Sequence, residues 1–199
     1  MNRRTGKALA LAAAGAAAGA AALGLYRSTH PVEASGPVSP DPGRRRRPLS
    51  HHLFDLPDGV VEGDVPTPDG GTIHYAEKGQ GRPLVLLHGV TLRHDVWAPQ
   101  FHQLADRYRV IAVDLRGHGT SRAGDAGFGI GRLGDDLATV LTALDLHHAV
   151  LVGHSMGGMT VMQFCGDHTD VLAERVDGLA LVATRAHQVF PPYVDRGAR

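Results

Sequence analysis

Eight residues decide the fold of this chain: Leu151-Val152-Gly153-His154-Ser155-Met156-Gly157-Gly158. They lead from one apolar segment through Gly-x-Ser-x-Gly into another, a pattern that predicts a strand, a sharp turn and a helix. So tight a turn strains the backbone at the serine, and the flanking glycines remove side chains that would collide with neighbouring elements. The helix that follows favours negative charge at its amino end. Ser155 is therefore the candidate nucleophile, with an ordinary strand-to-helix turn as the alternative.

Length and composition favour a single domain. The chain has 199 residues, of which 43% are hydrophobic, enough for one sizeable core. The formal net charge is zero, but residues 1–50 carry +6 and residues 51–199 carry −6. The basic run Arg44 to Arg47 has no interleaved aromatic residues and no nucleic-acid-binding motif follows it, so nucleic acid is not an expected partner. The single cysteine, Cys165, excludes a disulfide within the chain.

The first 50 residues divide into two segments that we exclude from the fold. Residues 1–26 are predicted to be a signal or membrane-anchor segment, because residues 8–25 contain only Ala, Gly and Leu and follow three basic residues. The hypotheses are a chain held at the membrane by one amino-terminal span, or a chain exported by a twin-arginine-like signal. A soluble Ala-rich tail is the alternative. Residues 27–50 are predicted to be a Pro/Arg-rich linker.

Strand and helix patterns alternate through residues 51–199. Two short strands separated by the turn-forming run Pro66 to Gly71 predict an antiparallel hairpin. Apolar runs and helical spacing then predict strands at 83–87, 110–113, 149–152 and 178–183, and helices at 97–107, at 133–144 and after Ser155. The predicted fold class is α/β: a mostly parallel sheet with helices on both faces, preceded by an antiparallel hairpin.

Three loops with distinctive sequences each follow a predicted parallel strand. They are His88-Gly89-Val90, then Asp114-Leu115-Arg116-Gly117-His118-Gly119-Thr120-Ser121, then the Ser155 turn. Their order, spacing and strand contexts resemble the α/β-hydrolase fold family, with its serine esterases, lipases and perhydrolases. The resemblance covers about residues 60–185. It implies that residues 51–199 form the amino-terminal part of an α/β-hydrolase domain.

The resemblance also implies roles for particular residues. Ser155 would be the nucleophile, and the backbone N–H groups of Val90 and Met156 would form the oxyanion hole. Two such fixed donors stabilise a tetrahedral intermediate by about 3 kcal/mol each. The same resemblance gives a supporting role, in the turn and the loop beside it, to Gly153, His154, Gly157, His88 and Gly89.

A serine nucleophile indicates acyl transfer, whereas the dehalogenase and epoxide-hydrolase branches use a carboxylate. The expected function is hydrolysis of a carboxylic ester through an acyl-enzyme. The expected partner is a small-molecule ester with an apolar acyl or alcohol part, with membrane association through residues 8–25. No cofactor and no metal site are expected, since the pairs His51-His52 and His147-His148 lack metal-ligand spacing. The alternatives are a non-catalytic binding or interaction module, a perhydrolase and a carbon–carbon bond hydrolase of the same fold.

The family's catalytic triad runs Ser, acid, His, with the last two after the nucleophile. Late residues of these types are His187 and Asp195, which stand in the reversed order. We therefore expect an incomplete α/β-hydrolase fold that lacks the last strands and stops before the catalytic acid and histidine. Such a chain would be nearly inactive alone, and its strand at 178–183 would be an open edge. The segment 190–193 would begin a lid.

Overall fold

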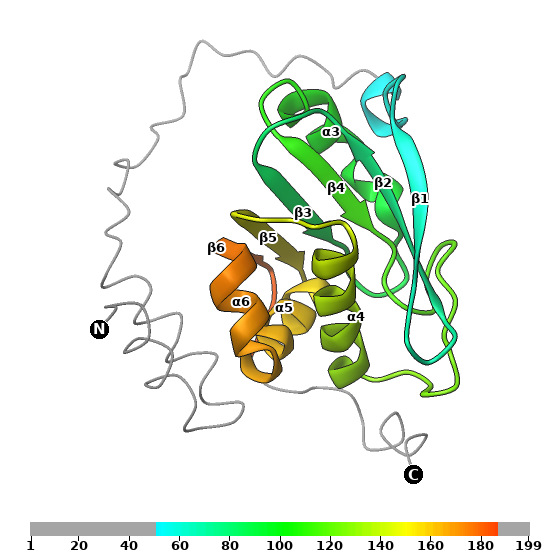
Figure 1. Ribbon diagram of the computed structural model, residues 1–199. Coiled ribbons are helices and arrows are strands. Elements are labelled where there is room, and N and C mark those ends of the chain that lie inside the picture. The colour runs from blue at the N-terminus through cyan, green and yellow to red at the C-terminus, as the bar shows by residue number, and fades with distance from the viewer. Residues whose placement is uncertain (1–50, 187–199) are drawn as a thin grey trace, which may run out of the picture.

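A six-stranded sheet organises residues 51–186, the part of the chain that the computed structural model describes (Figure 1). Its strands are β1 (Val61–Pro66), β2 (Thr72–Lys78), β3 (Pro83–Leu87), β4 (Arg109–Val113), β5 (Ala149–His154) and β6 (Val176–Val182). They lie in the order β1-β2-β4-β3-β5-β6. β2 is antiparallel to β1 and β4, and the remaining neighbours are parallel. The predicted hairpin and the mostly parallel sheet are confirmed.

Helices cover both faces of the sheet, as predicted. They are η1 (His51–Phe54), η2 (His94–Trp97), α3 (Ala98–Leu104), α4 (Ile130–Ala143), α5 (Met156–Asp167) and α6 (Thr169–Arg175). Side chains alternate along β3: Val85 and Leu87 pack in the core with α4 and α5, whereas Leu86 packs with Phe101 of α3. In Figure 1, α4, α5 and α6 are grouped together, apart from α3. β3 is consequently buried between two apolar layers.

The structure corrects two predicted boundaries and adds one helix that was not predicted. The helix expected at 97–107 spans only Ala98–Leu104, after a separate 3-10 turn. Pro99 lies in its first turn, where a missing N–H is tolerated. Ala183, expected in the last strand, lies just beyond β6 with a φ of +45°. The sequence analysis missed α6, a seven-residue helix without a fully buried residue, which is too short to show an apolar period.

The predicted localisation is also corrected. No helix among residues 51–186 has the length and apolar character needed to cross a membrane. The predicted anchor or export signal rested on segment 8–25, which lies outside the described residues. Also outside them are the linker 27–50, His187, Asp195 and the segment 190–193. The membrane-anchored or exported localisation, and the membrane association that goes with it, are therefore withdrawn.

One buried arginine ties the hairpin turn to a helix. Arg116 is 2% exposed and follows β4. Its guanidinium donates two hydrogen bonds to the Asp136 carboxylate of α4, at 2.7 and 2.8 Å, and pairs with Asp69 in the turn between β1 and β2. The Arg116 hydrogen bond holds the pKa of Asp69 well below its usual range, whereas burial raises the pKa of Asp136. Arg116 thus offsets the cost of burying the Asp136 carboxylate.

Replacing Arg116 with alanine is expected to lower the free energy of unfolding by about 3–5 kcal/mol, because Asp136 is left as a buried charge without its cation. Urea denaturation followed by circular dichroism measures the change. Arg132→Ala is the matched control, because its pair with Asp135 is exposed on one helix face and is worth only about 0.5 kcal/mol. Equal losses in the two variants would contradict the role given to Arg116.

Candidate active site

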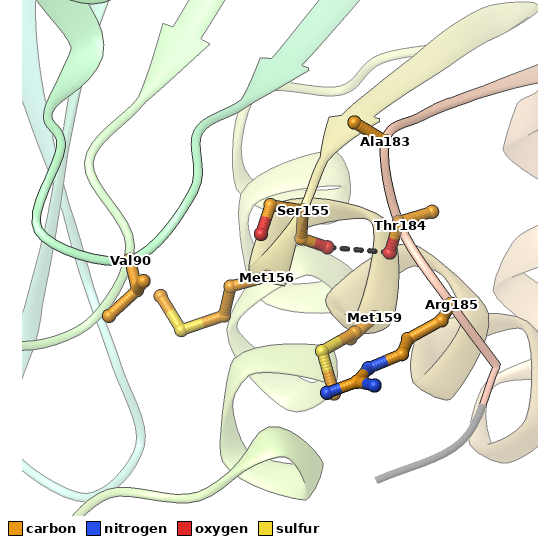
Figure 2. A pocket seen from close by; sticks show the side chains of 7 residues that line it. All are labelled: Val90, Ser155, Met156, Met159, Ala183, Thr184 and Arg185. Atoms are coloured by element: carbon orange, nitrogen blue, oxygen red, sulfur yellow. Dashed lines mark hydrogen bonds between the residues drawn. The ribbon is translucent and has the colours of Figure 1, made fainter. Parts of the chain in front are cut away.

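The turn between β5 and α5 places one serine in a strained conformation. Ser155 has a φ of +51° and a ψ of −113°, in the region that non-glycine residues rarely adopt. Its N–H donates to the Val182 carbonyl oxygen at 3.0 Å. Its own carbonyl oxygen accepts from the Thr184 hydroxyl at 2.6 Å and from the N–H of Gly158 at 3.0 Å (Figure 2). The end of β6 and the residue Thr184 beyond it therefore hold the Ser155 backbone from the side opposite to β3.

The two glycines of the Gly-x-Ser-x-Gly motif occupy positions with no room for a side chain. An added Cβ at Gly153 would lie 2.5 Å from the Gly157 carbonyl oxygen, and one at Gly157 would collide with the Leu87 carbonyl oxygen. Real Cβ atoms do not approach backbone atoms this closely, so either change would push α5 away from the sheet. The predicted requirement for small residues on both sides of Ser155 fits this packing.

The loop after β3 packs directly against the turn. An added Cβ at Gly89 would lie 3.3 Å from the Ser155 Cβ and 3.1 Å from the His154 Nδ1. The next residue, Val90, is 49% exposed and lines the same pocket as Ser155. The structure thus brings together Val90, Ser155 and Met156, the three residues to which the sequence analysis gave the central roles.

Ser155 lies in a pocket of about 290 Å³ with a largely apolar lining. Figure 2 shows the side chains that line it: Val90, Ser155, Met156, Met159, Ala183, Thr184 and Arg185. The two methionines supply flexible apolar surface that adapts to ligands of different shapes. Thr184, Met159 and Arg185 were missed by the sequence analysis, because no motif marks them and only the pairing of β6 with β5 brings Thr184 and Arg185 to this place.

His88 joins two loops at the carboxyl ends of the strands. It is fully buried, its Nε2 accepts the N–H of Leu115 at 3.0 Å, and its Nδ1 donates to the carbonyl oxygen of Gly89 at 2.7 Å. Burial lowers the pKa of His88, which favours a neutral ring. The ring of His118 lies against it, with centroids 5.4 Å apart. These contacts fit a supporting role for His88.

Asp114 organises the loop after β4. Its fully buried carboxylate accepts hydrogen bonds from the backbone N–H groups of His94 and Thr120, at 2.6 and 2.8 Å, and from the His94 ring at 3.0 Å. Burial alone would raise the pKa of Asp114, but these hydrogen bonds outweigh it and lower the pKa to about 2. The ionised carboxylate therefore fixes this loop and the segment with His94 to each other.

No imidazole or carboxylate within residues 51–186 hydrogen-bonds the Ser155 hydroxyl. His154 is next to Ser155 in sequence, but its ring lies beside Gly89. His187 and Asp195, the late residues of the right types, lie outside the described residues. The described part of the site thus provides a hydroxyl and a pocket.

One group of side chains in this part of the chain could hold a metal ion, formed by Glu62, His74 and His94. None of these residues lines the Ser155 pocket. The sequence analysis expected no metal site and did not consider these three residues, which are too widely spaced in sequence to form a recognisable motif.

Comparisons with known proteins agree with this architecture. Residues 82–196 match the family model described as alpha/beta hydrolase fold. The chain is 45% identical over 103 residues to the non-heme chloroperoxidase CPO-A1 of Kitasatospora aureofaciens, covering 51% of this chain and 38% of that protein. It is 32% identical over 130 residues to the 2-(acetamidomethylene)succinate hydrolase of Mesorhizobium japonicum, covering 64% of this chain and 47% of that protein.

A solved structure is similar over the same region. The esterase RhEst1 from Rhodococcus sp. superposes with a TM-score of 0.57 at 36% identity, covering 63% of this chain and 46% of the esterase. This chain spans less than half the length of each of these three proteins.

Replacing Thr184 with valine is expected to lower the free energy of unfolding by about 1 kcal/mol, because the Ser155 carbonyl oxygen loses its hydroxyl donor. Thr184→Ser keeps the hydroxyl and is the matched control. Urea denaturation of the three proteins measures the difference. If the valine variant is as stable as the serine variant, the hydrogen bond does not hold the turn.

Proposed function

The chain belongs to the α/β-hydrolase fold family, and from this premise we propose that it hydrolyses a carboxylic ester through an acyl-enzyme at Ser155. One observation carries the proposal: a serine with a φ of +51° stands between β5 and α5, at the pocket, where α5 begins. A strained non-glycine residue at such a position is typical of functional sites. Because Ser155 lines the pocket, its hydroxyl can contact a substrate bound there.

The backbone around Ser155 suits the charge that develops during acyl transfer. Attack of the Ser155 Oγ on the ester carbonyl carbon gives a tetrahedral intermediate with negative charge on the former carbonyl oxygen. Met156 is the first residue of α5, so its N–H has no acceptor within the helix and can donate to this oxygen. Val90, in the loop that packs on the turn, supplies the second N–H. Together these donors form the proposed oxyanion hole.

The remaining steps require a base. The Ser155 proton must go to a general base as the C–O bond forms, and that proton then goes to the leaving alcohol as the ester bond breaks. Water attacks the acyl-enzyme, again losing a proton to the base, and Ser155 recovers its hydrogen. The family resemblance implies a histidine, oriented by an acid, from the sequence after Ser155. His88 is unsuited to this task, because both of its ring nitrogens are engaged with the backbone.

The pocket favours a small ester with an apolar part. Val90, Met156 and Met159 present apolar surface beside Ser155, whereas Arg185 is exposed at its rim. The similarity to an esterase and to a 2-(acetamidomethylene)succinate hydrolase supports a small-molecule substrate. A serine at the turn supports acyl transfer over the carboxylate chemistry of other branches of the fold.

A fluorophosphonate reagent is expected to label the natural full-length protein at Ser155, because the hydroxyl attacks phosphorus as it would attack an ester carbonyl carbon. Mass spectrometry of the peptide that contains Ser155 detects the adduct. Ser155→Ala should abolish labelling and lower ester hydrolysis by about 10³-fold or more.

Ser121→Ala is the matched control, since Ser121 is the other serine of residues 51–186 and donates its hydroxyl to the Asp114 carbonyl oxygen. The fluorophosphonate reagent should label this variant to the same extent as the unsubstituted protein. An unlabelled natural protein, or labelling that survives Ser155→Ala, would overturn the proposal and favour a binding module of the same fold.

A second candidate function is perhydrolysis, which the 45% identity to a chloroperoxidase favours. Here hydrogen peroxide takes the place of water: its oxygen bonds to the acyl carbon, the bond to Ser155 Oγ breaks, and a peracid leaves while Ser155 recovers its proton. The peracid then oxidises bromide.

With an acetate ester, hydrogen peroxide and bromide, the protein is expected to brominate a phenolic dye, and Ser155→Ala to abolish this. Absorbance of the brominated dye gives the rate, and the same mixture without ester is the control. Bromination that is independent of the ester or of Ser155 would exclude a peracid made at this site.

A further inference from the structure

Three side chains from separate elements converge at the hairpin end of the sheet. Glu62 comes from β1, His74 from β2 and His94 from η2, and their ligand atoms lie within 4.8 Å of one another. The Glu62 carboxylate oxygens lie 3.7 Å from the His74 Nε2 and 3.8 Å from the His94 Nε2. Both distances exceed that of a hydrogen bond. The side chains of His74 and His94 are 8% and 4% exposed, so the two rings are held in the protein interior.

Each imidazole is oriented by a carboxylate on its other nitrogen. The His74 Nδ1 lies 2.8 Å from Asp64, and the His94 Nδ1 lies 3.0 Å from the buried Asp114. A carboxylate accepts the hydrogen of the nitrogen that it faces, so in a neutral ring the Nε2 lone pair is the one left available. Histidine ligands of metal ions are held by carboxylates in this same way.

The His74 Nε2 is buried and has no hydrogen-bond partner among the described residues. An unpaired buried nitrogen is costly, and histidines that serve only the core normally use both nitrogens. Here the nitrogen points toward a carboxylate and a second imidazole nitrogen, which are also electron-pair donors. Three convergent donors repel one another unless a positive charge lies among them.

We propose that Glu62, His74 and His94 bind a divalent metal ion, with Zn²⁺ the best match, and that Asp64 and Asp114 orient its two histidine ligands. Two imidazoles and one carboxylate are a donor set that zinc accepts, with water at the fourth position. Ligands about 2.1 Å from a tetrahedral ion lie about 3.4 Å apart. The observed 3.7 and 3.8 Å therefore require contraction by a few tenths of an ångström. Glu62 is 53% exposed, which leaves it free to make this movement.

The ion would tie three parts of the fold together. It joins β1 and β2 to η2, which begins four residues after Val90. Because none of the ligands lines the Ser155 pocket, the role is structural: the ion fixes the hairpin to the loop that carries Val90. This inference goes beyond ester hydrolysis and does not depend on it.

The test is metal binding by the untagged chain, with Zn²⁺ measured by equilibrium dialysis and Co²⁺ by visible absorption. We expect one tight Zn²⁺ per chain, a Co²⁺ spectrum of four- or five-coordinate geometry, and a higher melting temperature with Zn²⁺. Glu62→Gln and His74→Gln should each weaken binding by about 100-fold or more. Asp64→Asn should weaken it by about 10- to 100-fold, although Asp64 does not contact the ion.

The chain has 13 histidines, so adventitious binding needs its own control. The double variant His147→Gln, His148→Gln removes an exposed adjacent pair and should leave the tight site intact. Circular dichroism without metal shows whether each variant is folded. Since Glu62 is half-exposed, Glu62→Gln is expected to fold even if His74→Gln does not. No tight Zn²⁺ in the unsubstituted chain, or binding that Glu62→Gln and Asp64→Asn leave unchanged, would overturn the proposal.

Discussion

The close approach of α5 to the end of β3 is the constraint on which the rest of the structure depends. Gly157 lies against the carbonyl oxygen of Leu87, at a distance that leaves no room for a Cβ. This approach brings the first turn of α5 beside the loop that follows β3, where a Cβ added at Gly89 would lie 3.3 Å from the Ser155 Cβ. Val90, the next residue of that loop, lines the pocket together with Ser155. The helix can approach only because the turn at Ser155 accepts a strained backbone, and the hydrogen bonds to Val182 and Thr184 offset part of that strain.

Most of the fold could be predicted because its sheet is buried. β3 and β5 are nearly continuous apolar runs, and the turn-forming run Pro66 to Gly71 marks the hairpin. The sequence marked Ser155 because a tight turn imposes a local motif, and it gave Val90 and Met156 their expected roles through the family resemblance. All three line one pocket in the structure. Thr184 reaches the Ser155 carbonyl oxygen from 29 residues away through strand pairing, which leaves no trace in nearby sequence. α6 was missed for a different reason, since seven residues carry too little periodicity.

The histidines show why residue type does not settle a role. His88 and His94 both follow β3, and both are buried. His88 bonds to two backbone groups, so its ring completes a loop. His94 bonds to Asp114 through one nitrogen and faces Glu62 with the other. Leu115 lies 27 residues after His88 and Asp114 lies 20 residues after His94, and the parallel pairing of β3 with β4 brings each near its histidine. The role of each ring depends on the partner of its second nitrogen, and the sequence alone does not identify that partner.

Two charged clusters attach the β1–β2 hairpin to the rest of the sheet. One is Arg116 with Asp69 and Asp136, and the other is Glu62, His74 and His94 with their two aspartates. The hairpin lies at the end of the strand order and pairs with the remaining strands only through β4. Buried charges seldom add net stability compared with apolar packing, but they penalise any displacement that separates them. In the first cluster an arginine supplies the positive charge. The second contains only carboxylates and imidazoles, so the same physical requirement there has to be met by protons or by a cation.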